Sequence, residues 1–347
     1  MKKLFGALLA VCTLICFCIS SFSFADDESE ITTPPRSMLV LGDSISTGYK
    51  LYAYSSGNNY NTDSYANLLA SSLHLTQGNS YQNLAVDGIT STELLTSLQD
   101  GEYDEYLASS LICITVGGND LLGDFIDFLK ESVGLELIGT DGGFINADFT
   151  NPELIAKLSE CLNQIDQNII EFSDNLISIL STIHEYNESA YIICQTVFNP
   201  LDCLPIPETI KTLFDSKICD LNDAIKSCVK ELNDSSEFVK AVDVYRLFKG
   251  QTDVLTNMLD GDIHPSAKGH KKIYEALLDV VNSHSFQVSE ETTEAETESA
   301  RQASTQLENV RKSELTSVIY MCVFVAAFGV ALFIALIFYI RRKRSGR

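Results

Sequence analysis

Short apolar runs alternate with longer amphipathic stretches along the middle of the chain. The apolar runs are Met38–Leu41, Tyr81–Val86, Leu111–Val116, Ala190–Val197 and Val239–Val244. Near-continuous apolar runs of this length are typical of parallel strands that are buried on both faces of a sheet. The pattern therefore predicts an α/β domain with a parallel sheet of about five strands, covered by helices on both faces.

The stretches between these runs show the three- and four-residue spacing of amphipathic helices. The clearest helix is predicted from about Glu153 to Glu185. Its apolar positions are Leu158, Leu162, Ile165, Ile169, Phe172, Leu176, Ile179 and Ile183. A final helix is predicted over Ser266–Val281, with Ile273, Leu277 and Val280 buried on one side. The helices alternate with the predicted strands, as the α/β class requires.

The beginning of the chain has the pattern of a secretory signal peptide. Lys2 and Lys3 give a basic start, residues 4–19 are apolar, and Ser23-Phe24-Ala25 has the small residues of a cleavage site. We predict a signal peptide over residues 1–25, followed by a short linker over 26–36. A signal without a lipidation motif suits a bacterium of the Gram-positive type.

The end of the chain has the pattern of a membrane anchor. Residues 315–340 are apolar over about the length that crosses a bilayer, and the basic residues of 341–347 follow at once. By the positive-inside rule this basic tail is cytoplasmic. Residues 285–314 are rich in Glu, Thr, Ser and Ala, and predict a polar tether. We therefore expect a single-pass membrane protein whose domain, residues 37–284, lies outside the cell.

The chain is strongly acidic, with a formal net charge of −23 over 347 residues. The basic residues near both ends leave the middle of the chain more acidic still. A surface of this sign repels phosphate backbones, so the charge argues against a nucleic-acid partner. The sequence does not fix an oligomeric state.

Six of the ten cysteines lie in the predicted outer domain, because the others fall in the signal peptide and the membrane span. The six are Cys113, Cys161, Cys194, Cys203, Cys219 and Cys228. Cys113 and Cys194 lie within apolar strands, where buried thiols are expected. Cys203 could form a disulfide with Cys219 or Cys228. The spacing matches no metal-binding motif, so no metal is expected.

Several predicted strands and one predicted helix are flanked by residues that carry chemistry. Gly42-Asp43-Ser44 ends the first strand, Gly88 follows the second, and Gly117-Gly118-Asn119-Asp120 ends the third. His264 comes just before the final helix. In parallel α/β sheets, ligands bind beyond the carboxyl ends of the strands. These residues are therefore expected to converge on one site.

The order of these motifs resembles that of the GDSL or SGNH hydrolases, which are esterases and lipases. The resemblance covers residues 37–281. It implies a flavodoxin-like three-layer α/β/α sandwich with the strand order 2-1-3-4-5. It also implies a carboxylic ester hydrolase with a serine nucleophile and no cofactor. Ser44 is then the nucleophile and His264 the base, because a serine hydroxyl needs an adjacent base.

The same resemblance implies which groups stabilise the oxyanion of the tetrahedral intermediate. Carried over to this chain, they are the backbone N–H groups of Ser44 and Gly88 and the side-chain amide of Asn119. The family usually has an Asp three residues before the His, but Gly261 occupies that position here. Asp260 or Asp262 can complete the triad, or a backbone carbonyl can orient the imidazole instead. His270 is expected to be a surface or packing residue.

The expected substrate is an ester, either a lipid acyl ester or an O-acetyl group on a surface glycan. An acyltransferase using the same triad and a catalytically silent binding module are the alternatives. Residues 121–150 follow Asn119 and carry the apolar residues Phe125, Phe128, Leu129 and Val133. This segment either packs on the core or forms a lid over the acyl pocket.

Overall fold

The computed structural model describes residues 32–121, 123, 128, 151–204, 208–234 and 236–286. All of them belong to the first of two compact units, Met1–Gln287 and Val288–Arg347. Their centre is a parallel sheet with the strand order β2-β1-β3-β4-β5. The strands are β1 (Met38–Gly42), β2 (Tyr81–Asn83), β3 (Leu111–Thr115), β4 (Tyr191–Gln195) and β5 (Val239–Val242).

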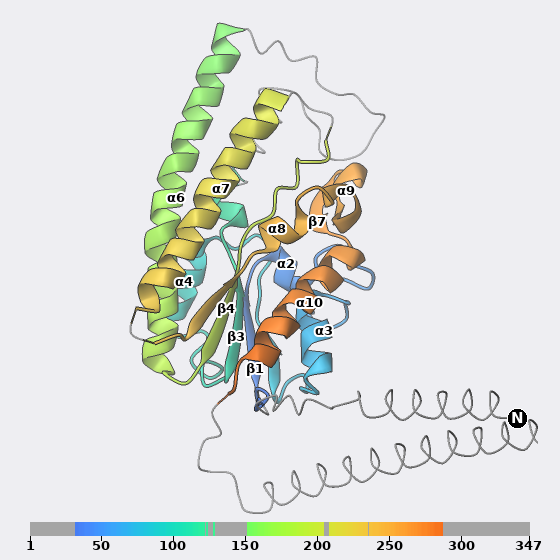
Figure 1. Cartoon of the computed structure of the whole chain (residues 1–347), viewed down its shortest axis with the longest axis vertical. Helices are drawn as coiled ribbons and strands as arrows, with labels where there is room; N and C mark the ends of the chain where they lie inside the picture. The colour runs from blue at the N-terminus through green and yellow to red at the C-terminus, as the bar shows by residue number, and fades with distance from the viewer. Residues whose placement is uncertain are drawn as a thin grey trace, which may run out of the picture. The chain divides into compact units, whose positions relative to one another are not determined.

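Helices cover both faces of this sheet (Figure 1). On one face lie α4 (Ser91–Gln99), α6 (Pro152–Tyr186) and α7 (Glu208–Leu232). On the other lie α3 (Tyr65–Ser72), α8 (Val244–Phe248) and α10 (Ala267–Ser283). Short elements complete the fold at the carboxyl edge of the sheet, namely α2 (Ser44–Thr47), α9 (Thr252–Leu255), β6 (Thr256–Asn257), η1 (Met258–Asp260) and β7 (Asp262–Pro265).

The two cores follow from alternation along the strands. In β1, Leu39 and Leu41 are buried towards α4, α6 and α7, whereas Met38 and Val40 are buried towards α3 and α10. A strand with apolar residues on both sides must be covered on both faces. The predicted α/β class and the five-stranded parallel sheet are therefore confirmed, and the strand order is the one that the resemblance implies.

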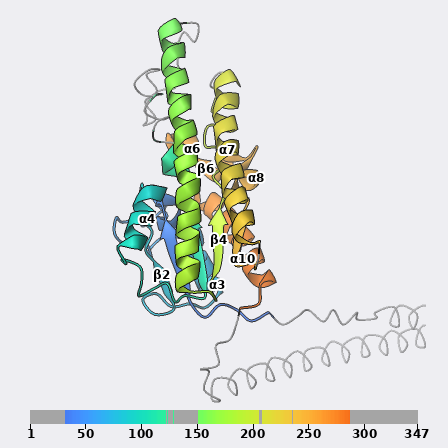
Figure 2. The same cartoon turned by 90° about the vertical axis from the view of Figure 1, so that its left-hand side faces the viewer.

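The long helices α6 and α7 run side by side and extend past the carboxyl ends of the strands (Figures 1 and 2). Their length explains this, because α6 has 35 residues and rises about 50 Å, whereas a five-residue strand covers about 17 Å. Asn151 caps the first turn of α6, where its side chain accepts from the N–H of Glu153 at 2.9 Å.

Three features of the described domain differ from the expected pattern. The apolar run at Tyr81–Val86 forms a strand only to Asn83, and Val86 is exposed. His264 lies in a short strand, β7, which pairs antiparallel with β6, rather than in a loop. The predicted tether begins at residue 285, but Phe286 is buried and its N–H donates to the carbonyl of Thr33 at 3.0 Å.

Several predicted segments lie outside the described residues. These are the signal peptide (1–25), the membrane span (315–340), the basic tail (341–347) and most of the segment 121–150. Of that last segment, Leu121 and Phe128 are buried in the core beside α4 and α6. Within the described ranges, no helix combines the length and apolar character needed to cross a bilayer.

The disulfide that the sequence allows between Cys203 and either Cys219 or Cys228 is not formed. Cys203, Cys219 and Cys228 are free thiols, and each sulfur contacts an oxygen instead. Cys219 and Cys228 lie on α7, where Cys219 approaches the Tyr245 hydroxyl at 3.5 Å. Cys113 and Cys194 are buried thiols, as expected from their place in apolar strands, and burial raises the pKa of Cys194 to about 12.

Candidate active site

Ser44 stands directly beyond the carboxyl end of β1. The strand ends at Gly42, whose φ is +119° and where an added Cβ would lie 1.8 Å from the Thr115 carbonyl oxygen. Only glycine fits this turn. The Asp43 carboxylate then accepts a hydrogen bond from the N–H of Ile45 at 3.0 Å, which fixes the first turn of α2. This turn presents the Ser44 hydroxyl at the sheet edge.

His264 lies between a hydroxyl and a carboxylate. Its Nε2 atom is 2.9 Å from Ser44 Oγ, and its Nδ1 atom is 2.6 Å from Asp262 Oδ1. The N–H of His264 also donates to the same carboxylate oxygen at 3.3 Å. Both ring nitrogens are therefore engaged, whereas Asp260 is exposed on η1. Of the two aspartates considered from the sequence, the structure places Asp262 at the imidazole.

The ionisation of the nearby carboxyl groups follows from burial and hydrogen bonding. For Asp262, burial raises the pKa, but hydrogen bonds from His264 and the attraction of the imidazolium form outweigh this effect, so the pKa lies below its ordinary value. Asp262 is thus held as a carboxylate. For Asp43, burial outweighs its hydrogen bonds and raises the pKa to about 6.

Asn119 lies in the helical turn that follows β3, and it lines the same cavity as Ser44 and His264. Its Nδ2 atom donates to the carbonyl of Ile89 at 2.9 Å, which leaves its second N–H for a ligand. Gly88 precedes Ile89 in an exposed turn and has a φ of +80°. Because an added Cβ there would meet nothing within 4 Å, the turn needs glycine for its backbone angle alone.

His270 is a packing residue, one of the two roles expected for it. It is fully buried, and its Nδ1 atom accepts from the N–H of Tyr65 at 3.2 Å. Burial lowers the pKa of His270 to about 3, so the imidazole stays neutral.

The sequence analysis assigned no role to two residues near the site, Asp120 and Tyr49. Asp120 accepts from the N–H of Ser91 at 3.0 and 3.1 Å, which ties the residue after Asn119 to the start of α4. The sequence signal that could have pointed to Asp120 is its position directly after Asn119. Tyr49 lies with its ring centroid 4.6 Å from that of His264, and no sequence pattern marks it.

A pocket that is partly open to solvent lies beside Ser44 and His264, with an enclosed volume of about 40 Å³. Its apolar lining consists of Ile45, Val116, Val197, Phe198, Pro200, Val244, Ile263 and Ile273. Its other lining residues include Asp43, Thr115, Gln195 and Thr196. Among the described residues, no group of three His, Cys, Asp or Glu side chains could hold a metal ion.

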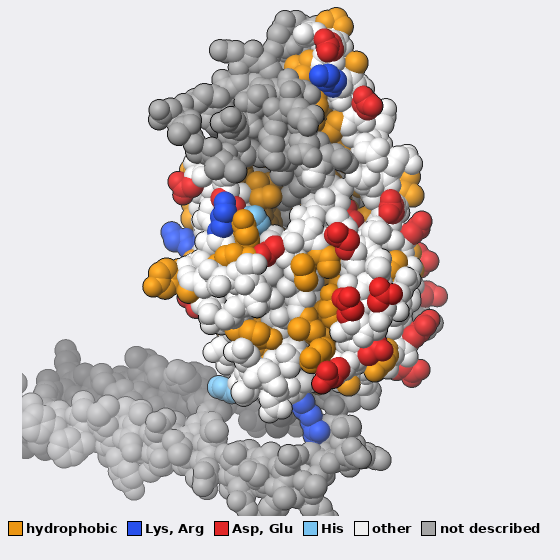
Figure 3. All heavy atoms as spheres, turned by 180° about the vertical axis from the view of Figure 1, so that it is seen from behind, with side chains coloured by type: hydrophobic (Ala, Val, Ile, Leu, Met, Phe, Trp, Pro, Cys, Tyr) orange, Lys and Arg blue, Asp and Glu red, His pale blue; other side chains and the backbone are white. Residues whose placement is uncertain are grey.

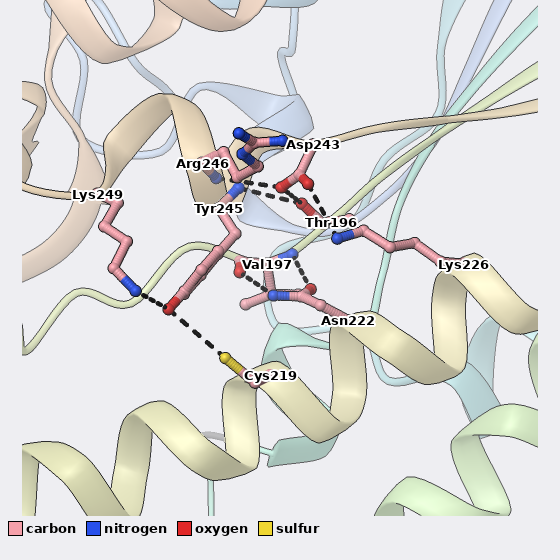
Figure 4. Close-up of polar contacts among 9 residues, drawn as sticks. All are labelled: Thr196, Val197, Cys219, Asn222, Lys226, Asp243, Tyr245, Arg246 and Lys249. Atoms are coloured by element: carbon pink, nitrogen blue, oxygen red, sulfur yellow. Dashed lines mark hydrogen bonds and ion pairs between the residues drawn. The ribbon is translucent and has the colours of Figure 1, made fainter.

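The cavity wall that follows β4 is fixed by polar contacts from α7 and α8 (Figure 4). The Asn222 side chain accepts from the N–H of Val197 at 2.7 Å and donates to its carbonyl at 2.8 Å. The hydroxyl of Thr196 accepts from the N–H of Tyr245 at 3.0 Å. Since both backbone groups of Val197 are held, this wall is built before any ligand arrives.

Comparison with known proteins identifies the family to which this α/β domain belongs. Residues 40–272 match the model of the GDSL-like lipase/acylhydrolase family. The chain belongs to this family and is a carboxylic ester hydrolase. No curated protein matches the chain.

Solved structures with similar folds have low sequence identity to the chain. Phospholipase A1 from Streptomyces albidoflavus NA297 is 18% identical, with 71% of this chain and 99% of that chain covered and a TM-score of 0.51. The lipase Lip_vut3 from a goat rumen metagenome is 19% identical, with 70% and 96% covered and a TM-score of 0.49. At this level the phospholipase supports the fold alone.

Proposed function

We propose that the protein is a membrane-anchored extracellular serine esterase that works through an acyl-enzyme on Ser44. The observation that carries the proposal is the chain of contacts from Ser44 Oγ to His264 Nε2 at 2.9 Å and from His264 Nδ1 to Asp262 at 2.6 Å. A serine hydroxyl becomes a nucleophile only beside such a base, and the carboxylate sets the tautomer of that base.

The reaction takes place in two steps. Ser44 Oγ attacks the ester carbonyl carbon while His264 Nε2 accepts the hydroxyl proton, and Asp262 stabilises the resulting imidazolium. The tetrahedral intermediate expels the alcohol, which receives its proton from His264. Water then attacks the acyl-enzyme, gives a proton to His264 and releases the carboxylic acid. Ser44 recovers its proton and the cycle is complete.

The oxyanion of the intermediate is stabilised by three donors in this proposal. They are the backbone N–H groups of Ser44 and Gly88 and the free N–H of the Asn119 amide. The bond from Asn119 to the Ile89 carbonyl supports this assignment, since it joins the amide to the turn that contains Gly88. Donors that are fixed before the reaction stabilise the oxyanion more than water does, because they need no reorganisation.

The proposed substrate is a lipid acyl ester rather than an O-acetyl group. The cavity beside Ser44 supports this choice, because half of its lining residues are apolar side chains against which an acyl chain can pack. The wall held by Asn222 gives the acyl chain a fixed surface to pack against.

Turnover of p-nitrophenyl esters from acetate to palmitate tests the proposal, with Ser44→Ala as the control. We expect hydrolysis that falls at least about 10³-fold in Ser44→Ala, with an acyl optimum longer than acetate. A preference for acetate would favour an esterase for acetylated glycans. Equal turnover by both proteins would contradict the serine mechanism.

The location of the protein is proposed from its sequence. The basic and apolar start, and the apolar stretch with its basic stop at residues 315–347, support secretion and anchoring. We expect the full chain in the membrane fraction after an alkaline wash, with its domain digested by protease added to intact cells. Recovery in the soluble cytoplasm would contradict this.

A further inference from the structure

Gln195 is a buried polar residue of the catalytic cavity that the mechanism does not use. It is the last residue of β4, lines the cavity and is 5% exposed. Its Nε2 atom has no hydrogen-bond partner within the described part of the chain. Because an unpaired buried donor has lost its hydrogen bonds to water, it destabilises the empty protein. A ligand that pairs with it recovers this loss.

The sheet register places Gln195 level with Gly42, the last residue of β1, after which Ser44 follows. Gly42 is aligned with Thr115 on β3, and Cys194 on β4 is aligned with Ile114. Gln195 is therefore level with Thr115, two strands away from Gly42. Neighbouring strands are about 4.8 Å apart, so Gln195 starts about 10 Å across the sheet from the end of β1.

The register also fixes the direction of the side chain. Gln195 is aligned with Val242, and Val242 is buried in the core beside α3 and α10. Aligned residues of parallel strands point to the same face of the sheet. On that face the cavity is bounded by Ile273 of α10 and by Val244. The Gln195 side chain thus lies on the face of the sheet that carries Thr115, Val244 and Ile273, all of which line the cavity.

The other polar side chains of the cavity already have partners. The Asp43 carboxylate accepts from Ile45, the Asn119 amide donates to Ile89, and the Thr196 hydroxyl accepts from Tyr245. The Thr115 hydroxyl is 2.7 Å from Ser46 Oγ. Gln195 is left as the polar side chain of the cavity whose buried donor has no partner among the described residues.

We propose that Gln195 selects the acyl group by donating from Nε2 to an oxygen carried within the acyl chain, several bonds from the ester carbonyl. The substrate class is then an ester of an oxygen-bearing acid, such as an ether or oxo acid, rather than of a plain fatty acid. This inference rests on the proposed function, since it assumes an acyl group attached at Ser44. A site built to pair with one substrate group discriminates against the analogue that lacks it.

The test compares p-nitrophenyl octanoate with analogues in which an ether oxygen replaces one methylene, at each position from C4 to C7. The full chain is assayed in isolated membranes, and membranes with Ser44→Ala give the background. We expect one analogue to exceed octanoate in kcat/KM by about ten- to a hundred-fold. In Gln195→Met, which keeps the length but lacks the donor, this ratio falls to about one.

Val244→Ala is the matched control, because it changes an apolar residue of the same cavity. It alters the fit of octanoate and of its analogues together, so their ratio stays as in the wild type. Gln195→Met is expected to unfold at no lower temperature than the wild type, since it removes an unpaired buried donor. Should it fail to fold, Gln195→Leu is assayed for the same loss of the ratio.

Two results would overturn the inference. One is a wild type that favours none of the ether analogues, and the other is a preference that survives in the folded Gln195 variant. Both are separable from failure of the proposed function. Hydrolysis of the acetate ester that depends on Ser44 supports the esterase whatever the ratio is, whereas hydrolysis independent of Ser44 contradicts it.

Discussion

The imidazole of His264 is held on both sides, and the choice between two aspartates can be tested residue by residue. We expect Asp262→Asn to lower kcat about 10³–10⁴-fold, because the amide no longer selects the required tautomer. Asp260→Asn, two positions away and exposed, is expected to change kcat by less than about twofold. Steady-state kinetics at pH 7 make the comparison. Equal losses in both variants would contradict the assignment.

His270 makes the domain sensitive to mild acid. Burial lowers its pKa from 6.5 to about 3, so the unfolded chain binds one more proton than the folded chain between these values. The contribution of His270 to the free energy of unfolding is fully present above pH 6.5. Below pH 6.5 it falls by about 1.4 kcal/mol per pH unit. Asp43, with its raised pKa, acts in the opposite direction below about pH 6.

His270→Gln isolates this contribution, because glutamine can still accept from Tyr65 but does not titrate, and Asp43 is common to both proteins. Urea unfolding at pH 7 and pH 5 measures the difference. We expect the wild type to lose about 1–2 kcal/mol more than the variant between the two pH values. The same loss in both would show that His270 is protonated in the folded protein.

At the scale of elements, the contact between α9 and α10 determines where His264 lies. An added Cβ on Gly269 of α10 would lie 2.1 Å from the carbonyl oxygen of Leu255, at the end of α9. The hairpin of β6 and β7, with His264, follows α9 directly. Gly269 therefore allows the close approach that anchors the hairpin.

Gly269→Ala tests this contact against helix propensity. In an ordinary helix interior this change stabilises by about 0.5–1 kcal/mol. Here we expect a net destabilisation of about 1–3 kcal/mol, because overpacking displaces α10 from α9. Lys271→Ala, at an exposed position of the same helix, is the control and is expected to be neutral. A Gly269→Ala protein with a raised melting temperature would contradict the account.

The strands were predictable from the sequence, whereas the hairpin that positions the histidine was not. Buried parallel strands leave a run of apolar residues, but β6 has two residues and β7 has four, which is too short for any period. Which carboxylate contacts His264 depends on this hairpin. Its register is irregular at Thr256 and Asn257, so spacing alone could not separate Asp262 from Asp260.

Gln195 was unpredictable for a different reason. Its strand reads as an apolar run, and a single glutamine at the end of such a run has no pattern of its own. Its significance depends on whether its side chain finds a partner, which is a property of the packed structure. The motif residues Ser44, Asn119 and His264 differ, because their types and order carry the signal.

At the scale of the whole molecule, the parallel sheet brings together segments that are far apart in the sequence. Ser44, Asn119 and His264 line one cavity at its carboxyl edge. Acidic side chains are numerous on the side of α4 and α6 in the view of Figure 3, in keeping with the net charge of −23. This charge disfavours anionic polymers as partners of the domain surface.

Covalent trapping of the nucleophile tests the central claim most directly. The full chain is treated with an alkyl fluorophosphonate, whose phosphorus bonds to an activated serine oxygen as fluoride leaves. Peptide mass spectrometry then locates the adduct. The account predicts one adduct, on Ser44, with complete loss of ester hydrolysis and with labelling abolished in His264→Ala. Labelling of another residue, or inactivation that leaves Ser44 unmodified, would contradict it.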